Sequence, residues 1–581
     1  MTNGPVGLGR DHERESHAMG RSSATPPSAT MTGRAEPPKE SYRDTVEAIV
    51  VAFILALVVR GFEAQAFVIP TGSMAPTLMG RHKEVACPQC GFVYAVNASG
   101  EVEASGYPNR DVEAGLCVNC RFLDRSLAEQ PSFKGDRILV MMFPYDLPFL
   151  PGSGSPERWD VVVFRYPEDP DVSYIKRLVG LPGETLRIAH GDLYLRAPGQ
   201  DRFVLARKPW KHQSSMQITV HDDRYRPRAL ADRPEWARWR SGSGWTASAS
   251  ERQYRSEGST DWSELRYSHL VPDPEQWDAI LEGREPRAPR PTLVTDFYSY
   301  NTNIPNPQDR LAPWMQADWV GDLTLQSHLD IKEVKAGGSI RWELIEGGVA
   351  HRCTVDLATG EATFTRGDEV LGQVATPIKG AGRHQVEFAN VDNRLTLVVD
   401  GRPVGGEGFT YEDGEVEPVP TGADLTPAAI AVRHATIETA DLVLKRDIYY
   451  TQEPGKHDFE LAWNERTPST PAELFDLLGD PSRFSKMTRP GRRDFEIGAD
   501  RFFMMGDNSP CSSDSRRWGE RDISWDESRS RRTYEVPRQY LTGKAFFIYW
   551  PHGVPVWPEI AWGRDFRFPF RPYLERMKWI R

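Results

Sequence analysis

The sequence predicts a mainly β protein that follows a single apolar N-terminal helix. Short runs of β-branched and aromatic residues end at Gly, Asp or Pro along most of the chain, and aromatic residues make up 10% of its 581 residues. A net charge of −11 and a pI near 5.7 argue against a nucleic acid as partner. A mean hydropathy of −0.53 excludes a polytopic membrane protein.

The N-terminal region combines a polar leader with an apolar segment. Residues 1–44 are rich in Ser, Pro and charge, which predicts a disordered tail. Residues 45–62 are largely apolar, and as a helix they extend about 27 Å, enough for a thin bilayer. Basic residues in the leader favour a cytoplasmic N-terminus on a retained single anchor. A buried helix and a signal peptide cleaved after Ala66 are the alternatives.

Strand-like runs dominate the rest of the chain. They lie at 135–145, 158–167, 173–188 and 192–197. Residues 200–290 show only weak periodicity, whereas 292–447 alternate with Gly/Asp turns in a manner typical of an antiparallel sandwich. Within it, "EFANVDNRLTLVVDGRPV" resembles a hairpin of concanavalin-like jelly-roll domains. Residues 452–492 predict a linker with one short helix.

Two side chains are candidates for nucleophilic chemistry. Ser73 lies between two prolines in "IPTGSMAPTL", and it is not part of the G-x-S-x-G elbow of Ser-His-Asp hydrolases. In a strand over 173–179, Lys176 shares a face with Tyr174 and Leu178, which would desolvate its amine and lower its pKa. A strand lysine that extends into water is the alternative for this segment taken alone.

Five sequence blocks place these two residues in a wider pattern. "IPTGSMAPTL", "GDRILV", "YIKRLVGLPGETL", "MMGDNSPCSSDSRRWG" and "GKAFFIYWP" occur in this order. Together they resemble the bacterial type I signal peptidases, the Ser-Lys leader peptidases. The resemblance covers about 63–198 and 495–553, and it implies an all-β catalytic domain interrupted by a large insert.

The resemblance also implies an activity and a set of site residues. It implies a serine endopeptidase that needs no cofactor for catalysis and that forms an acyl-enzyme intermediate. The implied nucleophile is Ser73, the general base is Lys176, and the oxyanion hole consists of the Ser73 N–H and the Thr71 hydroxyl. The residues implied to support the lysine are Ser512, Asp514, Arg516 and Asp507. Those implied to line the substrate pockets are Ile69, Pro70, Met74, Tyr174 and Ile175.

The last block departs from the family pattern at Ser509-Pro510-Cys511. Ser513 therefore competes with Ser512 for the orienting role, although the spacing favours Ser512. The implied substrates are the signal peptides of exported preproteins, cut after Ala-x-Ala-like sites at the bacterial inner membrane. An apolar loop at 140–152 would dip into the membrane interface or pack as an ordinary hairpin.

Four cysteines follow a metal-ligand spacing. Cys87, Cys90, Cys117 and Cys120 read C-x₂-C-x₂₆-C-x₂-C, which predicts structural zinc in a ribbon-like insertion at 84–124. Two disulfides are the alternative in an oxidising compartment. Neither Cys353 nor Cys511 receives a role.

These features predict six regions. They are a disordered cytoplasmic tail (1–44), a transmembrane helix (45–62), a first catalytic part (63–198), an inserted β-sandwich (199–451), a linker (452–492), and a second catalytic part with the C-terminal tail (493–581).

Two other hypotheses about function compete with the peptidase. One is a membrane-tethered module whose sandwich binds a glycan or protein, and the other is a Ser-Lys autoprotease, which the acidic charge disfavours.

Overall fold

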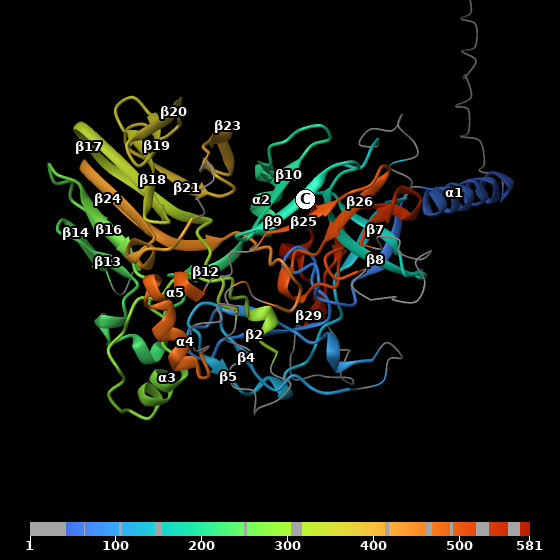
Figure 1. The fold of residues 1–581 in the computed structure, drawn as a ribbon, viewed down its shortest axis with the longest axis horizontal. Helices are drawn as coiled ribbons and strands as arrows, with labels where there is room; N and C mark the ends of the chain where they lie inside the picture. The colour runs from blue at the N-terminus through green and yellow to red at the C-terminus, as the bar shows by residue number, and fades with distance from the viewer. Residues whose placement is uncertain are drawn as a thin grey trace, which may run out of the picture. The chain divides into compact units, whose positions relative to one another are not determined.

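A computed structural model of the chain describes residues 42–62, 64–103, 107, 109–142, 145, 154–248, 252–303, 316–412, 418–456, 458, 468–487, 492–518, 534–555 and 570–581 (Figure 1). The chain divides into two compact units, Met1–Val58 and Val59–Arg581. Strands predominate, which confirms the prediction of a mainly β protein.

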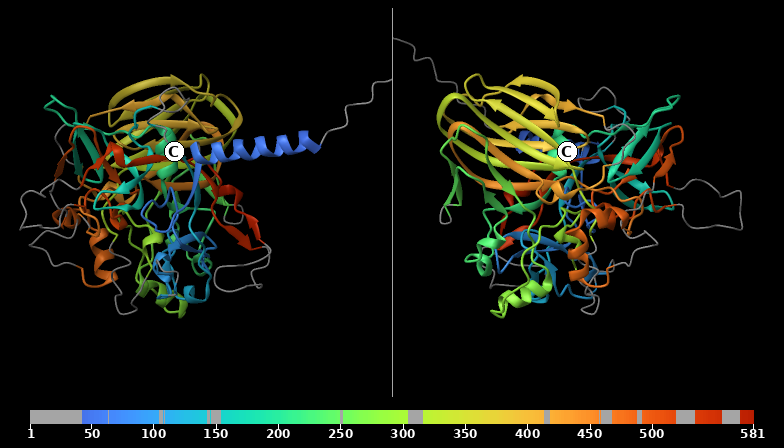
Figure 2. Two further views of the ribbon diagram at one scale, coloured as in Figure 1. Left: turned by 90° about the vertical axis from the view of Figure 1, so that its right-hand side faces the viewer. Right: turned by 60° about the vertical axis from the view of Figure 1, so that its left-hand side comes forward.

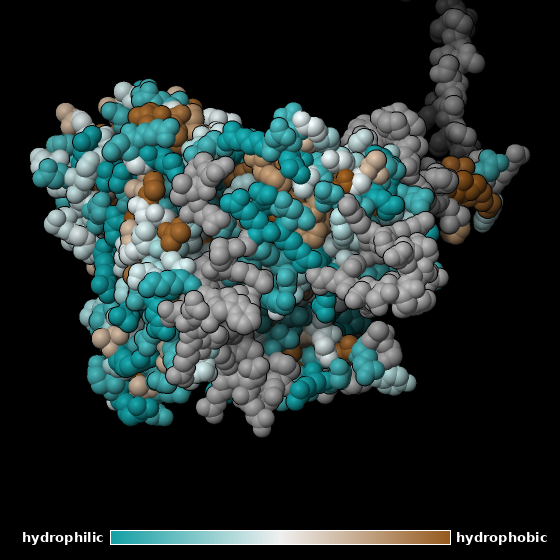
Figure 3. All heavy atoms as spheres, in the orientation of Figure 1, coloured by the Kyte–Doolittle hydropathy of each residue, from teal (hydrophilic) through white to brown (hydrophobic). Residues whose placement is uncertain are grey.

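Helix α1 (Tyr42–Phe62) begins three residues before the predicted start at 45. Its side chains are described at residue 42 and over 45–54, and the large apolar ones there are exposed, as Figure 3 shows in brown. In the described part of the chain, no helix is both long and apolar enough to cross a membrane. Most of the predicted disordered tail, residues 1–41, lies outside the described residues.

A seven-stranded sheet combines strands from both ends of the chain. In spatial order it consists of β1 (Ala64–Val68), β6 (Arg137–Met142), β28 (Leu541–Trp550), β7 (Val161–Tyr166), β8 (Asp169–Gly180), β26 (Arg501–Met505) and β27 (Val536–Pro537). All of its pairs are antiparallel. The sheet therefore joins segments that lie on either side of the insert in the sequence.

A four-stranded sheet follows the larger one along the chain. Its order is β11 (Val204–Leu205), β10 (Asp192–Arg196), β9 (Thr185–Ala189) and β25 (Arg493–Glu496). The predicted strand runs between 135 and 197 supply β6 to β10, as expected from their apolar alternation. Three two-stranded sheets are β2 (His82–Ala86) with β3 (Val93–Asn97), β4 (Gly115–Leu116) with β5 (Leu123–Asp124), and β29 (Gly553–Pro555) with β30 (Phe570–Pro572).

The insert contributes a thirteen-stranded antiparallel assembly built around two long strands, β17 (Leu323–Glu346) and β24 (Ala428–Arg446), which pair along most of their length (Figures 1 and 2). One path continues through β18 (Val349–Asp356), β19 (Glu361–Arg366) and β20 (Glu369–Ala375), and another through β21 (Gly382–Asn390), β22 (Arg394–Val399) and β23 (Arg402–Thr410). Its core includes Leu325, Trp342, Phe364, Phe388 and Ile430.

The weakly periodic region 200–290 also supplies strands to this assembly. They are β12 (Ile218–Asp222), β13 (Trp239–Ser241), β14 (Trp245–Ser248), β15 (Gln253–Ser256) and β16 (Ser263–Tyr267). Three of them, β12, β15 and β16, pair with β24. Their short length explains the weak periodicity in the sequence, because three to five residues give little alternation to detect.

Four short helices complete the described elements: α2 (Trp210–Met216), α3 (Pro274–Leu281), α4 (Pro471–Leu478) and α5 (Pro481–Met487). The prediction of one helix in the linker was wrong, because α4 ends at Leu478, with Gly479 as its C-cap, and Pro481 starts a second helix. Most of the predicted interfacial loop at 140–152 lies outside the described residues.

Candidate active site

The turn that carries Ser73 follows β1 directly. Within it, the Ala75 N–H donates to the Gly72 carbonyl at 3.1 Å. Lys176 lies on β8, and its Nζ is 2.7 Å from Ser73 Oγ, at hydrogen-bond distance. Two residues separated by 103 positions in the sequence therefore meet through the seven-stranded sheet.

The Lys176 amine lies in a desolvated environment. The side chain is 3% exposed, Ser73 is 9% exposed, and Lys176 Nζ lies 5.4 Å from the centre of the Tyr174 ring. Burial lowers the pKa of Lys176 from its ordinary value of 10.5 to about 8, although Asp514 and Asp507 act in the opposite direction. Within the described residues, Lys176 forms no ion pair, and besides Ser73 its amine donates to the Ile175 carbonyl at 3.1 Å.

Both acids near the lysine are bound by arginines. Arg516 makes two hydrogen bonds to Asp514, of 2.9 and 2.7 Å, and the Gly506 N–H donates to the same carboxylate at 3.1 Å. Arg177 makes two hydrogen bonds of 2.7 Å to Asp507. All four charged side chains are fully buried. The sequence alone did not select Arg177, because nothing in the sequence around it indicates that it pairs with Asp507.

Ser512 and Ser513 lie in different environments. Ser512 is buried, whereas Ser513 is exposed. A Cβ atom placed on Gly506 would come within 2.3 Å of both Ser512 Oγ and the Ser73 carbonyl, so Ser512 packs close to the Ser73 turn. Ser512 Oγ is buried and has no hydrogen-bond partner among the described residues. Ser512 thus lies beside the candidate site without a hydrogen bond to Lys176.

The remaining predicted residues surround the Ser73–Lys176 pair. Ile69 and Met74 are buried in one apolar cluster, and Ile175 packs against it. Tyr174 stacks on the ring of Tyr166 with their centres 4.6 Å apart. The other two predicted residues, Pro70 and Thr71, are exposed. The predicted pocket residues thus include buried apolar side chains, whereas Pro70 and Thr71 are accessible to solvent.

Comparison with known proteins agrees with this arrangement. Residues 121–228 and 447–550 match the family described as "Signal peptidase, peptidase S26". These segments contain Lys176, Asp507, Asp514 and Arg516, and curated signal peptidases match as well. In these two segments the chain is similar to signal peptidases. The two matched segments are separated by residues 229–446, which contain most strands of the sandwich.

The similarity to individual proteins is partial. Signal peptidase I of Pseudomonas aeruginosa is 54% identical over 59 residues, which are 9% of this chain and 21% of the relative. Signal peptidase I of Rickettsia typhi is 30% identical over 141 residues, 24% of this chain and 38% of the relative. The chain therefore spans well under half the length of these relatives. A carbohydrate binding module, CBM66 from Bacillus subtilis, aligns over 36% of this chain and 96% of its own at 14% identity and a TM-score of 0.22.

The four cysteines of the predicted metal site converge. Their sulfur atoms lie within 4.8 Å of one another, with 3.6 Å between Cys87 and Cys120 and 3.6 Å between Cys90 and Cys117. These separations exceed a disulfide bond of about 2.05 Å and approach the roughly 3.8 Å between thiolates on tetrahedral zinc. The donor set and its spacing therefore fit a zinc ion.

Two similar loops present these cysteines. In the first loop, the N–H of Gly91 donates to the Cys87 carbonyl at 2.8 Å, and in the second the N–H of Arg121 donates to the Cys117 carbonyl at 2.8 Å. The φ angles are 77° at Gly91 and 60° at Arg121, both in the left-handed region. Glycine adopts this conformation freely. In the second loop the same conformation is adopted by Arg121, whose guanidinium lies 3.2 Å from the centre of the Phe297 ring.

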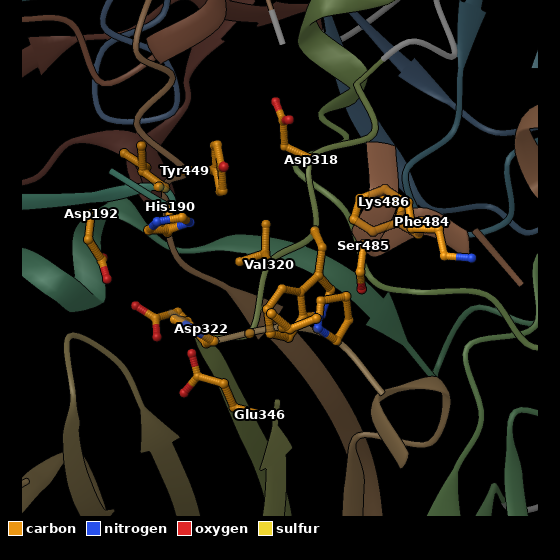
Figure 4. A pocket seen from close by; sticks show the side chains of 17 residues that line it. His190, Asp192, Asp318, Val320, Asp322, Glu346, Tyr449, Phe484, Ser485 and Lys486 are labelled. Carbon is orange, nitrogen blue, oxygen red and sulfur yellow. The ribbon is translucent and has the colours of Figure 1, made fainter. Parts of the chain in front are cut away.

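A separate cavity of about 430 Å³ adjoins the four-stranded sheet and the sandwich (Figure 4). Carboxylate oxygens of Asp192, Asp322 and Asp392 lie within 4.8 Å of one another, and burial raises the pKa of Asp192 and Asp322 well above their ordinary values. Lys208 forms ion pairs of 2.6 Å with Asp392 and 2.8 Å with Asp447. This acidic cluster joins the two sheets, and it is distinct from the Ser73–Lys176 site.

Proposed function

We propose that this chain is a membrane-anchored signal peptidase I that removes signal peptides from exported preproteins after Ala-x-Ala-like sites. The observation that carries this proposal is the 2.7 Å separation of Lys176 Nζ and Ser73 Oγ in a buried environment. An amine with a pKa of about 8 is partly neutral near pH 7 and accepts a proton from the hydroxyl.

The proposed reaction proceeds through an ester of Ser73. Its Oγ attacks the scissile carbonyl carbon while the hydroxyl proton passes to Lys176 Nζ. Lys176 then gives this proton to the leaving amine as the C–N bond breaks, which leaves the acyl-enzyme. Neutral Lys176 next accepts a proton from water, the resulting hydroxide attacks the ester, and the Ser73 oxygen recovers its proton as it leaves.

Two hydrogen-bond donors would stabilise the oxyanion that forms in each step. They are the Ser73 N–H and the Thr71 hydroxyl, and neither donates a hydrogen bond to another residue within the described ranges. Free donors aimed at a developing oxyanion supply a large part of the rate in acyl transfer. This availability supports the assignment of Thr71, which lies on the exposed side of the turn.

The sheet supports binding of an extended peptide. Strand β1 lies at the edge of the seven-stranded sheet, immediately before Ile69 and the Ser73 turn. An edge strand offers unpaired backbone groups to which a peptide adds as a further strand. In our proposal, Ile69, Pro70, Met74, Tyr174 and Ile175 shape pockets that admit only small side chains at the first and third positions before the cut.

We place the enzyme at the bacterial inner membrane. The proposed anchor is the predicted span 45–62 within α1, with the N-terminus in the cytoplasm and the catalytic part outside. The six large apolar side chains described on this helix are 48–68% exposed, and a lipid bilayer would cover them. They are Val46, Ile49, Val50, Val51, Phe53 and Ile54.

We also propose that Cys87, Cys90, Cys117 and Cys120 bind one structural zinc ion. Four protein thiolates complete a tetrahedral site, so the ion would hold the two loops together and would not bind substrate. In this proposal, the catalytic reaction itself needs no cofactor.

The decisive experiment measures cleavage of a synthetic preprotein with an Ala-x-Ala site by purified full-length protein in detergent. We expect Ser73→Ala and Lys176→Met to reduce cleavage to background while circular dichroism stays unchanged. Methionine keeps the apolar volume of the lysine stem and removes the proton acceptor. Lys456→Met, which alters a lysine that is 57% exposed, is the matched control and should cleave normally. Cleavage by Ser73→Ala would refute the proposed nucleophile.

A further inference from the structure

A turn from the insert contacts the turn that carries Ser73. The turn is a short 3₁₀ helix, Ser299–Asn301, which precedes β17 of the sandwich. It reaches Ser73 through two contacts, one polar at Asn301 and one apolar at Tyr300. Neither residue belongs to the segments that match the signal peptidase family.

The polar contact is a reciprocal pair of amides. Asn301 Nδ2 donates to Asn508 Oδ1 at 2.7 Å, and Asn508 Nδ2 donates to Asn301 Oδ1 at 2.8 Å. The second Nδ2 hydrogen of Asn508 is donated to the Gly72 carbonyl at 3.0 Å. The Asn508 N–H donates to the Ser73 carbonyl at 3.1 Å. Asn508 therefore bonds to the carbonyl groups on both sides of the Ser73 side chain.

These bonds control the direction of the oxyanion donor. The Gly72 carbonyl and the Ser73 N–H belong to the same planar peptide unit, so a bond that holds the carbonyl also holds the N–H. Asn508 can donate to this carbonyl only if its NH₂ group faces Gly72. Asn301 stabilises that orientation, because it donates to Asn508 Oδ1 and accepts from Asn508 Nδ2.

The apolar contact restricts the same peptide unit from another side. A Cβ atom placed on Gly72 would lie 2.1 Å from a ring carbon of Tyr300, so the tyrosine ring packs directly on the Gly72 backbone. Tyr300 is fully buried beside Ala75 and Met79 of the Ser73 turn. A glycine is required here because the ring occupies the position of any side chain.

The turn is itself anchored. Thr302 Oγ1 donates to the Ser299 carbonyl at 2.7 Å and accepts from the Leu116 N–H at 2.9 Å. Leu116 directly precedes Cys117 of the cysteine cluster. The turn that carries Asn301 is therefore held by both the insert and the cysteine segment.

We propose that Asn301 and Tyr300 are positioning residues for catalysis, supplied by the insert, which fix the 72–73 peptide so that the Ser73 N–H points at the oxyanion. This inference rests on the proposed peptidase function. The insert then forms part of the active-site framework, and a signal peptidase core from which it is removed would lack one support of its nucleophile turn.

The test compares steady-state cleavage of the Ala-x-Ala preprotein by full-length wild type, Asn301→Leu and Asn301→Asp. Leucine removes both amide bonds, and aspartate keeps the size but cannot donate to Asn508. Loss of one oxyanion donor reduces kcat by about 10²–10³ in other enzymes, so a misdirected donor should reduce kcat at least about 10-fold. We expect KM to stay within about twofold and the pH midpoint of kcat/KM to stay unchanged, since Lys176 is untouched.

Two controls separate positioning from loss of structure. Asn303→Leu changes the same residue type two positions away, where no hydrogen bond to a described residue is lost, and it should leave kcat unchanged. As a second control, circular dichroism of both Asn301 variants should match that of the wild type. Wild-type kcat in both Asn301 variants, or an equal loss in Asn303→Leu, would overturn the inference. Inactive wild type, or active Ser73→Ala, would instead refute the proposed function.

Discussion

Arg177 and Asp507 form a fully buried ion pair through two hydrogen bonds of 2.7 Å. Arg177 directly follows Lys176 in the sequence. Asp507 is one of two acids that raise the pKa of Lys176, and the other, Asp514, is bound by Arg516. Each acid thus has its own guanidinium partner. The arginines leave Lys176 without a carboxylate of its own, so desolvation decides its protonation.

The pH dependence of cleavage follows from this arrangement. Lys176 acts as a base only when neutral, and its pKa is lowered to about 8. We expect kcat/KM to rise with pH through a midpoint near 8 and to level off above it, because kcat/KM reports the free enzyme. Cleavage of a preprotein between pH 6 and 10 measures the midpoint. A midpoint near 6.5 would point to a histidine base, and one above 10 to a solvated lysine.

The lowered pKa of Lys176 also predicts a stability cost. The unfolded chain binds this proton with a pKa near 10.5 and the folded chain with one of about 8, and each pKa unit corresponds to about 1.4 kcal/mol. Below pH 8 both states are protonated, so the folded state bears the full cost of about 3 kcal/mol. Between pH 8 and 10.5 the cost declines as the folded state loses its proton first.

Lys176→Met should therefore be more stable than the wild type at pH 7, by up to about 3 kcal/mol, with a smaller difference at pH 9.5. Denaturant unfolding of both proteins in detergent at the two pH values measures the difference. Such a gain is expected where a catalytic group is held in an unfavourable environment. A difference that does not change with pH would show that the lysine is not titrating in this range.

The sequence was sufficient to select residues that lie in the family blocks. Ser73, Lys176, Asp514 and Arg516 were selected there, and the fold brings all four together. The strands β6 to β10 were also predictable, because each has enough residues for its alternation to be visible. Both predictions rest on local signals in short segments.

The contacts across the insert were not predictable in this way. Asn301 and Asn508 are 207 positions apart, and neither the composition nor the periodicity of 298–303 suggests a partner. Amide pairs and arginine–acid pairs such as Arg177–Asp507 are determined by tertiary packing, which a single sequence does not encode in any local pattern. The strands of region 200–290 could not be located individually because they are only three to five residues long, and the partner of three of them, β24, lies about two hundred residues away.

The two adjacent serines of the last block provide a matched pair of variants. Ser512 Oγ is buried beside the Ser73 turn and has no partner within the described residues, whereas Ser513 is exposed. The sequence pattern predicts that Ser512, and not Ser513, orients the Lys176 amine. We expect Ser512→Ala to lower kcat by about 10- to 100-fold and Ser513→Ala to leave it unchanged, measured by preprotein cleavage. The reverse order would assign the role to Ser513.

The cysteine cluster predicts one zinc ion per chain. Metal analysis of purified protein should give one equivalent for the wild type and well under one for Cys117→Ser, because the alternative of two disulfides requires sulfur atoms far closer than 3.6 Å. Cys353→Ser, which changes a buried cysteine of the sandwich, is the control and should keep the ion.

Removal of zinc by a chelator should lower the thermal midpoint of unfolding, since the ion would hold the two cysteine loops together. It should also lower cleavage, because Leu116 connects this segment to the turn behind Ser73. Four protected thiols that stay metal-free, and that become reactive only after reduction, would establish disulfides instead.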